Sequence, residues 1–283
     1  MIDAGLIYDV GAHYGDDTAW YLELGYRVVA VEVNPELAKE LETKFNTAVK
    51  DKKLTVVNIA ITEKDNETVP FYISQVVCRS SAKKNLAERD GNLAQTINIA
   101  TTRLSTLFEK YGTPYYCKID IEGNDAIAIN SLAGKSACPS YISCEHGYHT
   151  IAETYKDRDQ LYETLNTLRA AGYNSFQLID QDSLLPLTGE KHYSRIHTLP
   201  SRVMTKLERI TGLYSSRYNN RHRLARERKM RYDYLTAPFG EMLPDNWADY
   251  ETTRKYIGFH FNDYYVHTQN KQLIFWVDIH ARS

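Results

Sequence analysis

Two glycines and a carboxylate near the start of the chain have the spacing of a nucleoside-binding pocket. An apolar run at residues 6–10 leads into Gly11 and Gly15, and a second apolar run ends on Glu32, twenty-three residues after Asp9. Glycine lets a backbone approach a ligand closely and adopt φ values that a Cβ forbids, and a carboxylate at a strand tip can accept both hydroxyls of a ribose. The chemistry expected here is the binding of a nucleoside cofactor.

The spacing of the glycines bears on which nucleoside is bound. A dinucleotide site uses G-x-G-x-x-G, so that a helix N-terminus cradles a pyrophosphate, whereas this chain has Gly11-x-x-x-Gly15. Carboxylates flank the turn at Asp9, Asp16 and Asp17, and they repel a diphosphate but attract a cationic sulfonium. S-adenosylmethionine is therefore favoured over NAD. A nicotinamide-dependent oxidoreductase and a non-catalytic nucleoside-binding module stay as alternatives.

Other residues are expected to complete the cofactor site. Asn58 can offer its amide to the adenine edge, and Ile59 can pack on the ring beside Ala60. Asn58 is equally well explained as an ordinary polar residue at a strand end. The full set of expected cofactor-binding residues is Asp9, Gly11, His13, Gly15, Thr18, Glu32, Val33, Asn34, Asn58, Ile59, Ala60, Asp120 and Glu122.

A second group of polar side chains follows two later apolar runs. Asp120 and Glu122 end the run at 115–121, and Glu145 and His146 end the run at 140–146, so the two pairs face one pocket if these strands are neighbours. Asp120 or His146 could act as a general base, with Glu145 beside them. Alternatively Asp120, Glu122 and Glu145 could hold Mg²⁺. A third interpretation is that Asp120 or Glu122 only binds an amino group or caps the helix near Asn124.

Apolar runs alternate with helical periodicity along most of the chain, which predicts an α/β fold with a mostly parallel sheet. The expected sheet strands are 6–10, 27–33, 54–61, 115–121, 140–146, 175–180 and 273–280, with shorter strands at 67–73 and 96–99. Residues 1–183 and 271–283 form the predicted core. Residues 184–270 are predicted to be a largely helical insertion that caps the site and binds the acceptor.

Composition bears on partners and location. The net charge is −2, and residues 201–234 hold ten basic side chains against three acidic ones among several tyrosines. This stretch is either a solvated helical face or a surface for an anionic or nucleotide-linked substrate or a membrane face; nucleic acid is not expected. Four cysteines without metal spacing, no leader peptide and no long apolar run indicate a soluble cytoplasmic protein.

Three ordered motifs resemble the FkbM-type methyltransferase family. They are the run from Asp9 through Gly15 to Thr18, the run from Val29 to Pro35, and Lys118-Ile119-Asp120-Ile121-Glu122-Gly123. The C-terminal run 276–281 is also similar to the end of some longer members. The resemblance implies a class I Rossmann-like fold and O-methylation with S-adenosylmethionine, commonly of hydroxyls on sugars or natural products. The family usually has Asn where this chain has His13.

Overall fold

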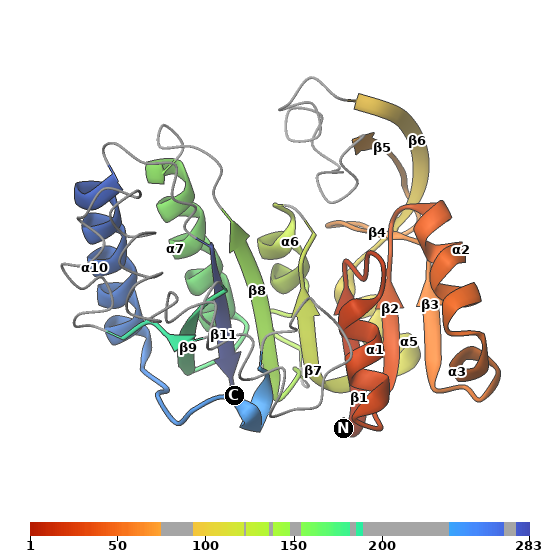
Figure 1. The fold of residues 1–283 in the computed structure, drawn as a ribbon, viewed down its shortest axis with the longest axis horizontal. Coiled ribbons are helices and arrows are strands. Elements are labelled where there is room, and N and C mark those ends of the chain that lie inside the picture. Colours follow the sequence, from red (N-terminus) through yellow and green to blue (C-terminus); the bar gives the residue numbers. More distant parts are fainter. Residues whose placement is uncertain are drawn as a thin grey trace, which may run out of the picture. The chain divides into compact units, whose positions relative to one another are not determined.

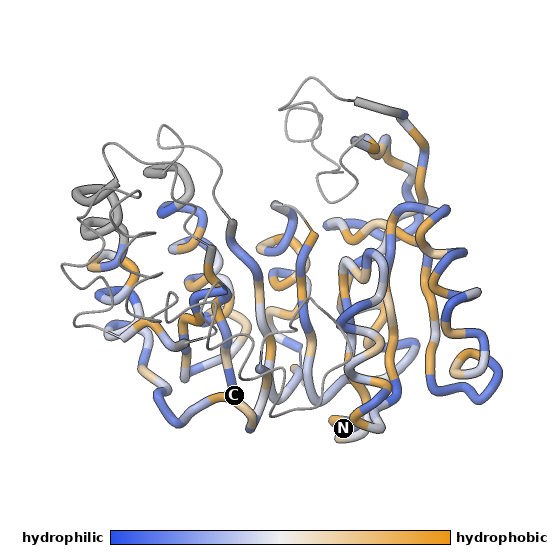
Figure 2. The backbone as a smooth tube through the Cα atoms, in the orientation of Figure 1, coloured by the Kyte–Doolittle hydropathy of each residue, from blue (hydrophilic) through white to orange (hydrophobic). Residues whose placement is uncertain are grey.

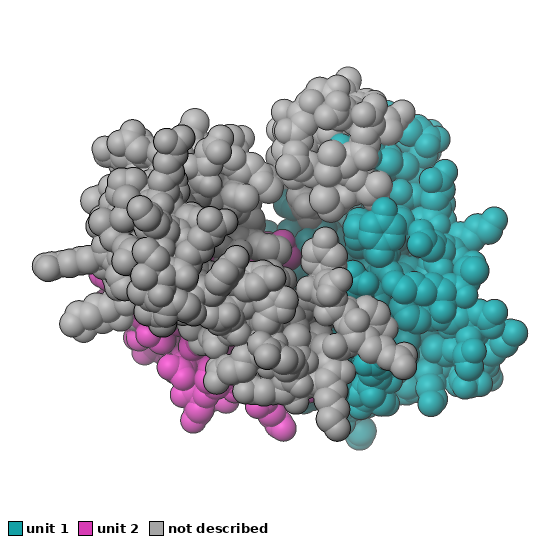
Figure 3. Space-filling model, in the orientation of Figure 1, with its two compact units in different colours: residues 1–144, 167–173, 283 teal, residues 145–166, 174–282 magenta. Residues whose placement is uncertain are grey.

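The computed structural model describes residues 1–74, 93–121, 123–135, 138–147, 154–181, 185–188, 238–268 and 276–283. The chain forms two compact units, coloured separately in Figure 3. Unit 1 comprises residues 1–144, 167–173 and 283, and unit 2 comprises residues 145–166 and 174–282. Each unit is described by itself.

Unit 1 is built on a parallel sheet (Figure 1). Its strands lie in the order β8-β7-β1-β2-β3, with bounds Tyr141–Gly147, Thr113–Ile119, Ile2–Val10, Arg27–Val31 and Leu54–Val57; β8 leaves unit 1 after Cys144. The connecting helices are α1 (Asp16–Glu23), α2 (Pro35–Lys44), α3 (Asn46–Lys50), α5 (Leu104–Tyr111) and α6 (Asp125–Asn130). This alternation of parallel strands and helices is the predicted one.

The centre of this sheet is apolar, as parallel strands covered by helices must be. Residues 6–10 of β1 and 28–31 of β2 are all buried, and Figure 2 shows their apolar stretches in orange. The one charged residue in these runs is Asp9, with no exposed surface. A buried carboxylate is costly unless it is paired, which already marks Asp9 as part of a polar arrangement.

A separate three-stranded sheet, β4-β6-β5, corrects the predicted strand 54–61. That stretch divides into β3 (Leu54–Val57), which pairs with β2, and β4 (Ala60–Ile61), which pairs with β6 (Leu93–Thr102). β6 also pairs antiparallel with β5 (Thr68–Ser74). The prediction of one strand was wrong because apolar residues stand on both sides of Asn58, whereas the chain passes from one sheet to the other at residues 58 and 59.

Unit 2 contains an antiparallel arrangement of β10 (Leu185–Pro186), β9 (Ser175–Asp180) and β11 (Trp276–Arg282), in that order. Its helical elements are most of α7 (Thr154–Ala170), the short η4 (Gly240–Met242) and α10 (Tyr250–Thr268). Each of the seven expected sheet strands has a counterpart, although only 54–57 of the expected 54–61 lies in the sheet with β2, and β10 is an additional two-residue strand. The α/β class with a mostly parallel sheet is therefore confirmed.

The predicted insertion at 184–270 is described only at 185–188 and 238–268, and α10 is the longest element in these described ranges. The basic stretch 201–234 lies outside the described residues. Among the described residues, no helix is both long enough and apolar enough to cross a membrane. Cys117, Cys138 and Cys144 carry free thiols.

Candidate functional site

The turn after β1 is closed by its own backbone. The N–H groups of Gly11 and Ala12 both donate to the carbonyl of Val31, at 2.9 and 3.1 Å. Gly11 has a φ of 90°, and a Cβ there would lie 1.9 Å from the carbonyl oxygen of Asp120. The sequence predicted that this glycine makes room for a ligand. The structure instead shows that the end of β7 fills the space, so Gly11 is required for packing between β1 and β7.

Gly15 has a similar packing role at the start of α1. It adopts a left-handed conformation with φ 76° as the N-cap residue of the helix. A Cβ there would lie 2.5 Å from the side chain of Leu41 and 2.7 Å from that of Phe45. The two glycines are thus both needed to form the turn, and their expected contact with a cofactor stays a prediction.

Glu32 joins this turn to the end of β2. Its Oε2 accepts the backbone N–H of His13 and its Oε1 accepts that of Asn34, both at 2.8 Å. Burial raises the pKa of the carboxyl, and these backbone bonds oppose that shift because they favour the ionised form. A carboxylate has about four acceptor sites. Glu32 can therefore hold the two backbone groups and still accept hydroxyls of a ribose.

Asn34 and Val33 follow Glu32 in the loop before α2. The Asn34 side chain accepts the N–H of Glu36 at 3.0 Å and caps the helix, which begins with Pro35 as the sequence predicts. Val33 is partly buried against a small apolar cluster of Ala60, Phe71 and Ile99. Val33 thus lies directly after the candidate ribose-binding carboxylate and beside the three-stranded sheet.

Asn58 braces the same loop from the next strand. Its amide nitrogen donates to the carbonyls of Glu32 at 2.8 Å and Val33 at 2.9 Å, which uses both of its hydrogens. Of its amide groups only the oxygen is left for a ligand, and the expected contact of Asn58 with adenine stays a prediction. Ile59 is partly buried, and Ala60 is buried beneath Val33. These positions shape the wall of the site more than they present polar groups.

His13 places an imidazole in the turn with one nitrogen unpaired. Its φ is 49°, a value uncommon for residues other than glycine. The ring packs edge-on against Tyr14, and its Nε2 is buried without a hydrogen-bond partner among the described residues. Burial is the main cause that lowers the pKa of His13, so the ring is neutral at pH 7. Its Nε2 can then form one hydrogen bond with a ligand.

Asp9 lies beneath the turn and does not face solvent. Its Oδ2 accepts the hydroxyl of the buried Thr18 at 2.6 Å, and its Oδ1 has no hydrogen-bond partner among the described residues. Burial raises the pKa of Asp9 to about 6, and the ammonium of Lys118, 4.0 Å from Oδ1, opposes this. The structure brings together Asp9 and Thr18 as predicted, but as a buried support of α1.

Lys118 is the main residue that the sequence interpretation missed. Its Nζ lies 2.6 Å from Oδ2 of Asp17 and 3.4 Å from Oδ2 of Asp120. The signal was present in the sequence, because Lys118 and Asp120 alternate with apolar residues at the end of a strand, next to the strand that carries Asp9. Asp120 therefore ends β7 within a cluster of charges. Glu122 lies outside the described residues.

Asp125 is a second buried carboxyl that the sequence did not single out. It begins α6, and its Oδ2 accepts the N–H of Gly123 at 3.2 Å while Oδ1 has no hydrogen-bond partner among the described residues. Burial, and after it the charge of Asp120, raises the pKa of Asp125 to about 7. The loop after β7 thus has two carboxyls whose charges oppose each other.

Glu145 and His146 end β8 and belong to unit 2. Nε2 of His146 is buried without a hydrogen-bond partner among the described residues, and burial lowers the pKa of its ring to about 4. The charge of Asp278 opposes that shift. The expectation that these residues share a pocket with Asp120 and Glu122 stays a prediction.

Asp278 is itself held in place within unit 2. Its Oδ2 accepts the amide of Gln181 and lies 3.7 Å from Nε2 of His280. All three side chains are buried. Asp278, which the sequence did not single out, is therefore the buried charge that opposes the lowering of the pKa of His146.

The magnesium hypothesis gains no support from the geometry. Across the described ranges, no group of three or more His, Cys, Asp or Glu side chains is arranged to hold a metal ion. The carboxylates of unit 1 instead converge on the ammonium of Lys118. Their charge is therefore balanced in part by the chain's own cation.

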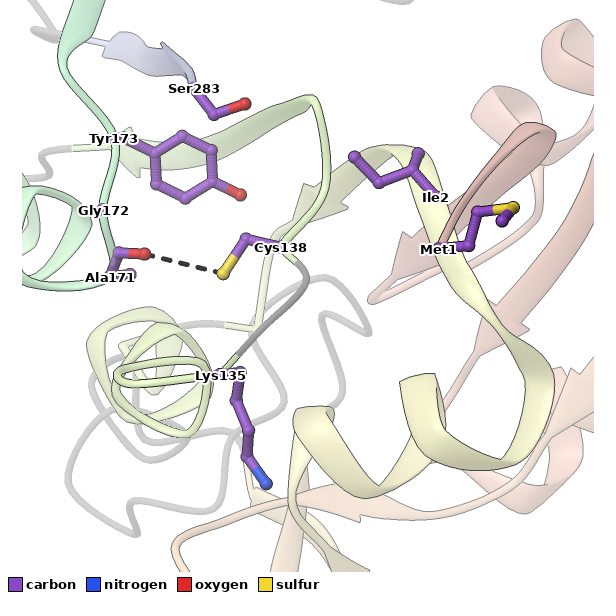
Figure 4. Close-up of a pocket in the computed structure, with 8 residues that line it drawn as sticks. All are labelled: Met1, Ile2, Lys135, Cys138, Ala171, Gly172, Tyr173 and Ser283. Carbon is purple, nitrogen blue, oxygen red and sulfur yellow. Dashed lines mark hydrogen bonds between the residues drawn. The ribbon is translucent and has the colours of Figure 1, made fainter.

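A pocket of about 460 Å³ lies within unit 1 but at the other end of β1 (Figure 4). Met1 and Ile2 line it at the start of that strand, whereas the Gly11 turn follows the strand's last residue. Nine extended residues span about 30 Å. In the same pocket Cys138 lies half-buried, and its thiol donates to the carbonyl of Ala171 at 3.5 Å. This pocket is separate from the turn.

The family model described as the methyltransferase FkbM domain matches residues 9–175, more than half of the chain. A search of curated proteins finds no match.

Solved structures with a similar fold include a putative sarcosine dimethylglycine methyltransferase from Galdieria sulphuraria. That protein is 10% identical, with a TM-score of 0.41, over 99% of this chain and 79% of its own. A methyltransferase from Thiobacillus denitrificans, solved with S-adenosyl-L-homocysteine, is 10% identical with a TM-score of 0.39, over 100% and 86% of the two chains. Likenesses this low carry no conclusion about substrate. On the family match, this chain belongs to the FkbM methyltransferase domain family.

Proposed function

We propose that this methyltransferase uses S-adenosylmethionine as its donor and methylates a hydroxyl, most reasonably on a sugar or glycan. The observation that carries the choice of donor is the set of aspartates around the turn. Asp9, Asp17 and Asp120 carry three carboxylates against the one ammonium of Lys118. An excess of negative charge suits a ligand with a sulfonium and an ammonium, and it disfavours a pyrophosphate.

The residues of unit 1 also fit the neutral part of this donor. Glu32 is fixed by two backbone N–H groups and keeps acceptor capacity for the ribose hydroxyls. The buried, unpaired Nε2 of His13 needs a partner that the described chain does not supply. When bound, S-adenosylmethionine would supply an electrophilic methyl group. The role of unit 1 is then to bind and orient the donor, which contributes much of the rate in an in-line displacement.

Two residues are candidates for the proton of the attacking hydroxyl. His146 is kept neutral by burial, so the lone pair of one ring nitrogen is available at any pH well above 4. Asp120 ends β7, and Lys118 holds its carboxylate at 3.4 Å. Either could receive the proton, and the turnover rates of variants at the two positions decide between them. A family-level resemblance and the abundance of aromatic residues, which stack on sugar rings, support a sugar acceptor; a non-sugar natural product is the alternative.

Transfer of a labelled methyl group tests this function. The protein is incubated with S-adenosylmethionine carrying a tritiated methyl group and one class of acceptor at a time. The acceptors are free sugars, nucleotide-linked sugars, glycans and phenolic natural products. We expect incorporation into a sugar-containing acceptor, with a gain of one methyl by mass spectrometry. An ether linkage survives mild alkali, whereas a methyl ester does not. Methylation at nitrogen or carbon, or labelling of phenols alone, would contradict the sugar hydroxyl.

A further inference from the structure

Lys118 lies among three carboxylates that come from three different elements. Its Nζ is 2.6 Å from Asp17 in the first turn of α1, 3.4 Å from Asp120 after β7, and 4.0 Å from Asp9 in β1. The Lys118 side chain is only 19% exposed. Charges that are largely removed from solvent interact more strongly and are screened less by salt than surface ion pairs.

The register of the sheet explains why these groups meet. β1 and β7 are parallel, and Asp9 is the register partner of Lys118. Asp120 follows two residues after Lys118, so it lies on the same side of the extended chain. Its backbone N–H donates to the carbonyl of Val10 at 2.9 Å, which fixes the end of β7 against the turn. The cluster is therefore built by the central pair of strands.

The electrostatic balance of the cluster depends on a single cation. Three carboxylates and one ammonium leave a net charge of −2 when all four are ionised (−3 + 1). Like charges this close disfavour ionisation of one another, and an opposite charge favours it. Without Lys118, the buried Asp9 would face Asp17 and Asp120, and among the described residues the hydroxyl of Thr18 is its remaining hydrogen-bond partner.

We propose that Lys118 is a positioning residue of the donor site: its ammonium holds Asp17 and Asp120 beside the buried Asp9, and its charge favours the ionised form of Asp9, which suits the cationic end of S-adenosylmethionine. This inference rests on the proposed use of that donor. Lys118 acts through the aspartates and takes no part in the methyl transfer itself.

The titration of the Asp9 carboxyl provides a measure of this role of Lys118. Burial raises its pKa to about 6, the charge of Lys118 lowers it, and the charges of Asp17 and Asp120 raise it. The groups that face Asp9 from the packed elements are Lys118 and Cys117 of β7, Asp120 beyond it, and Asp17, Thr18 and Tyr21 of α1. Removing the ammonium leaves only effects that raise the pKa of Asp9, apart from the Thr18 hydrogen bond.

The first test needs no ligand. The carboxyl ¹³C signal of Asp9 is titrated from pH 4 to 9 in the wild type, Lys118→Met, Lys118→Arg and Lys135→Met. Lys135 is a matched control because it pairs with one carboxylate, Glu109, at 3.0 Å on the surface. We expect Lys118→Met to raise the Asp9 midpoint by about one pH unit or more, and the two other variants to leave it near the wild-type value.

The second test measures donor binding by calorimetry over the same pH range. At pH 7 we expect Lys118→Met to bind S-adenosylmethionine about twofold more weakly if the Asp9 midpoint rises by one pH unit from about 6, and about tenfold more weakly if it rises by two, with the loss shrinking at higher pH as Asp9 ionises. Lys118→Arg should restore most of the affinity. A purely structural role for Lys118 would instead weaken binding equally at every pH.

Each outcome bears on a different claim. An unchanged Asp9 midpoint in Lys118→Met would overturn the positioning role. If that variant does not fold, Lys118→Gln serves in its place: it removes the same positive charge but keeps a polar side chain, so the Asp9 midpoint should rise, and an unchanged midpoint is equally contradictory. If the wild type fails to bind S-adenosylmethionine while the midpoints shift as expected, the proposed donor is wrong and the electrostatic role of Lys118 stands.

Discussion

The backbone N–H of His13 donates to Oε2 of Glu32 at 2.8 Å, which ties the turn after β1 to the loop after β2. This bond uses the backbone of His13 and does not engage its imidazole, whose buried Nε2 has no hydrogen-bond partner within the described parts of the chain. The identity of residue 13 therefore matters through its φ of 49° and through its ring, and not through the bond to Glu32.

Replacing His13 separates these two effects. Asn tolerates a left-handed conformation, so His13→Asn should stay within about 0.5 kcal/mol of wild-type stability. His13→Val places a β-branched residue at positive φ and should cost about 1–3 kcal/mol. Urea unfolding of both variants checks this. Equal stability of the two would show that the turn does not require the observed backbone conformation.

Gly11→Ala tests the packing of β1 against β7. A Cβ there lies 1.9 Å from a carbonyl oxygen of Asp120, so the strands must separate, and we expect a loss of about 3 kcal/mol or more. Gly25→Ala is the matched control, because Gly25 has nearly the same φ, 91°, and a Cβ added there would meet nothing within 4 Å. It should lose only about 1–2 kcal/mol of backbone strain. The difference in unfolding free energy between the two variants isolates the steric cost.

Asp125 should make stability depend on pH. Its pKa is raised from 3.8 unfolded to about 7 in the folded chain, mainly by burial. A carboxyl with a raised folded pKa contributes stability that is fully present below about pH 4 and is lost as pH rises through about 7. Asp125→Asn should therefore lose less stability than the wild type between pH 5 and pH 8.

Thermal unfolding at those two pH values measures the difference, with Asp51→Asn as an exposed control on the same unit. An identical pH response in wild type and Asp125→Asn would mean that this carboxyl does not titrate in the window. The neighbouring Asp9, with a folded pKa of about 6, should account for part of the response that remains.

His146→Gln tests the proton acceptor. If the imidazole takes the proton of the hydroxyl, kcat should fall about 100-fold or more, while the affinity for S-adenosylmethionine changes little. Because the pKa of His146 is lowered to about 4, the wild-type rate should not lose activity through its protonation between pH 6 and 8. Asp278→Asn removes a charge that raises this pKa, so it should move any acid limb to lower pH.

The same kinetic measurements test Asp120, the competing candidate for the proton acceptor. Should Asp120→Asn abolish turnover while His146→Gln retains it, the proton acceptor is Asp120. Because Asp120 also belongs to the Lys118 cluster, its variant is expected to weaken donor binding as well. A fall in kcat without a change in donor affinity is therefore expected for His146 alone.

Much of the fold follows from local sequence signals. The strand predicted at 175–180 has those bounds in the structure, and the Asn34-Pro35 start of α2 is capped as expected. These elements depend on residues close together in the chain, namely an apolar run and a helix cap. The break in the predicted strand 54–61 depends instead on Asn58, whose amide bonds to carbonyls twenty-five and twenty-six residues earlier.

The residues of the site also divide into those that a local sequence signal predicts and those that depend on distant partners. Glu32 was found because its place at a strand tip is a local signal, although its bond to His13 was not foreseen. Gly11 was assigned to ligand approach because a glycine turn looks the same whether a ligand or the chain occupies the space; the occupant is Asp120, over a hundred residues away. Lys118 was overlooked because its partners Asp9 and Asp17 become neighbours only through the pairing of β1 with β7.

Calorimetric titration of the wild type with S-adenosylmethionine and NAD, alongside Glu32→Gln and Glu36→Gln, tests the central claim most directly. The account predicts that S-adenosylmethionine binds and NAD does not. Glu32→Gln should bind at least about tenfold more weakly, because an amide cannot accept both backbone N–H groups, and the exposed Glu36→Gln should match the wild type. Binding of NAD alone, or an unchanged affinity in Glu32→Gln, would contradict it.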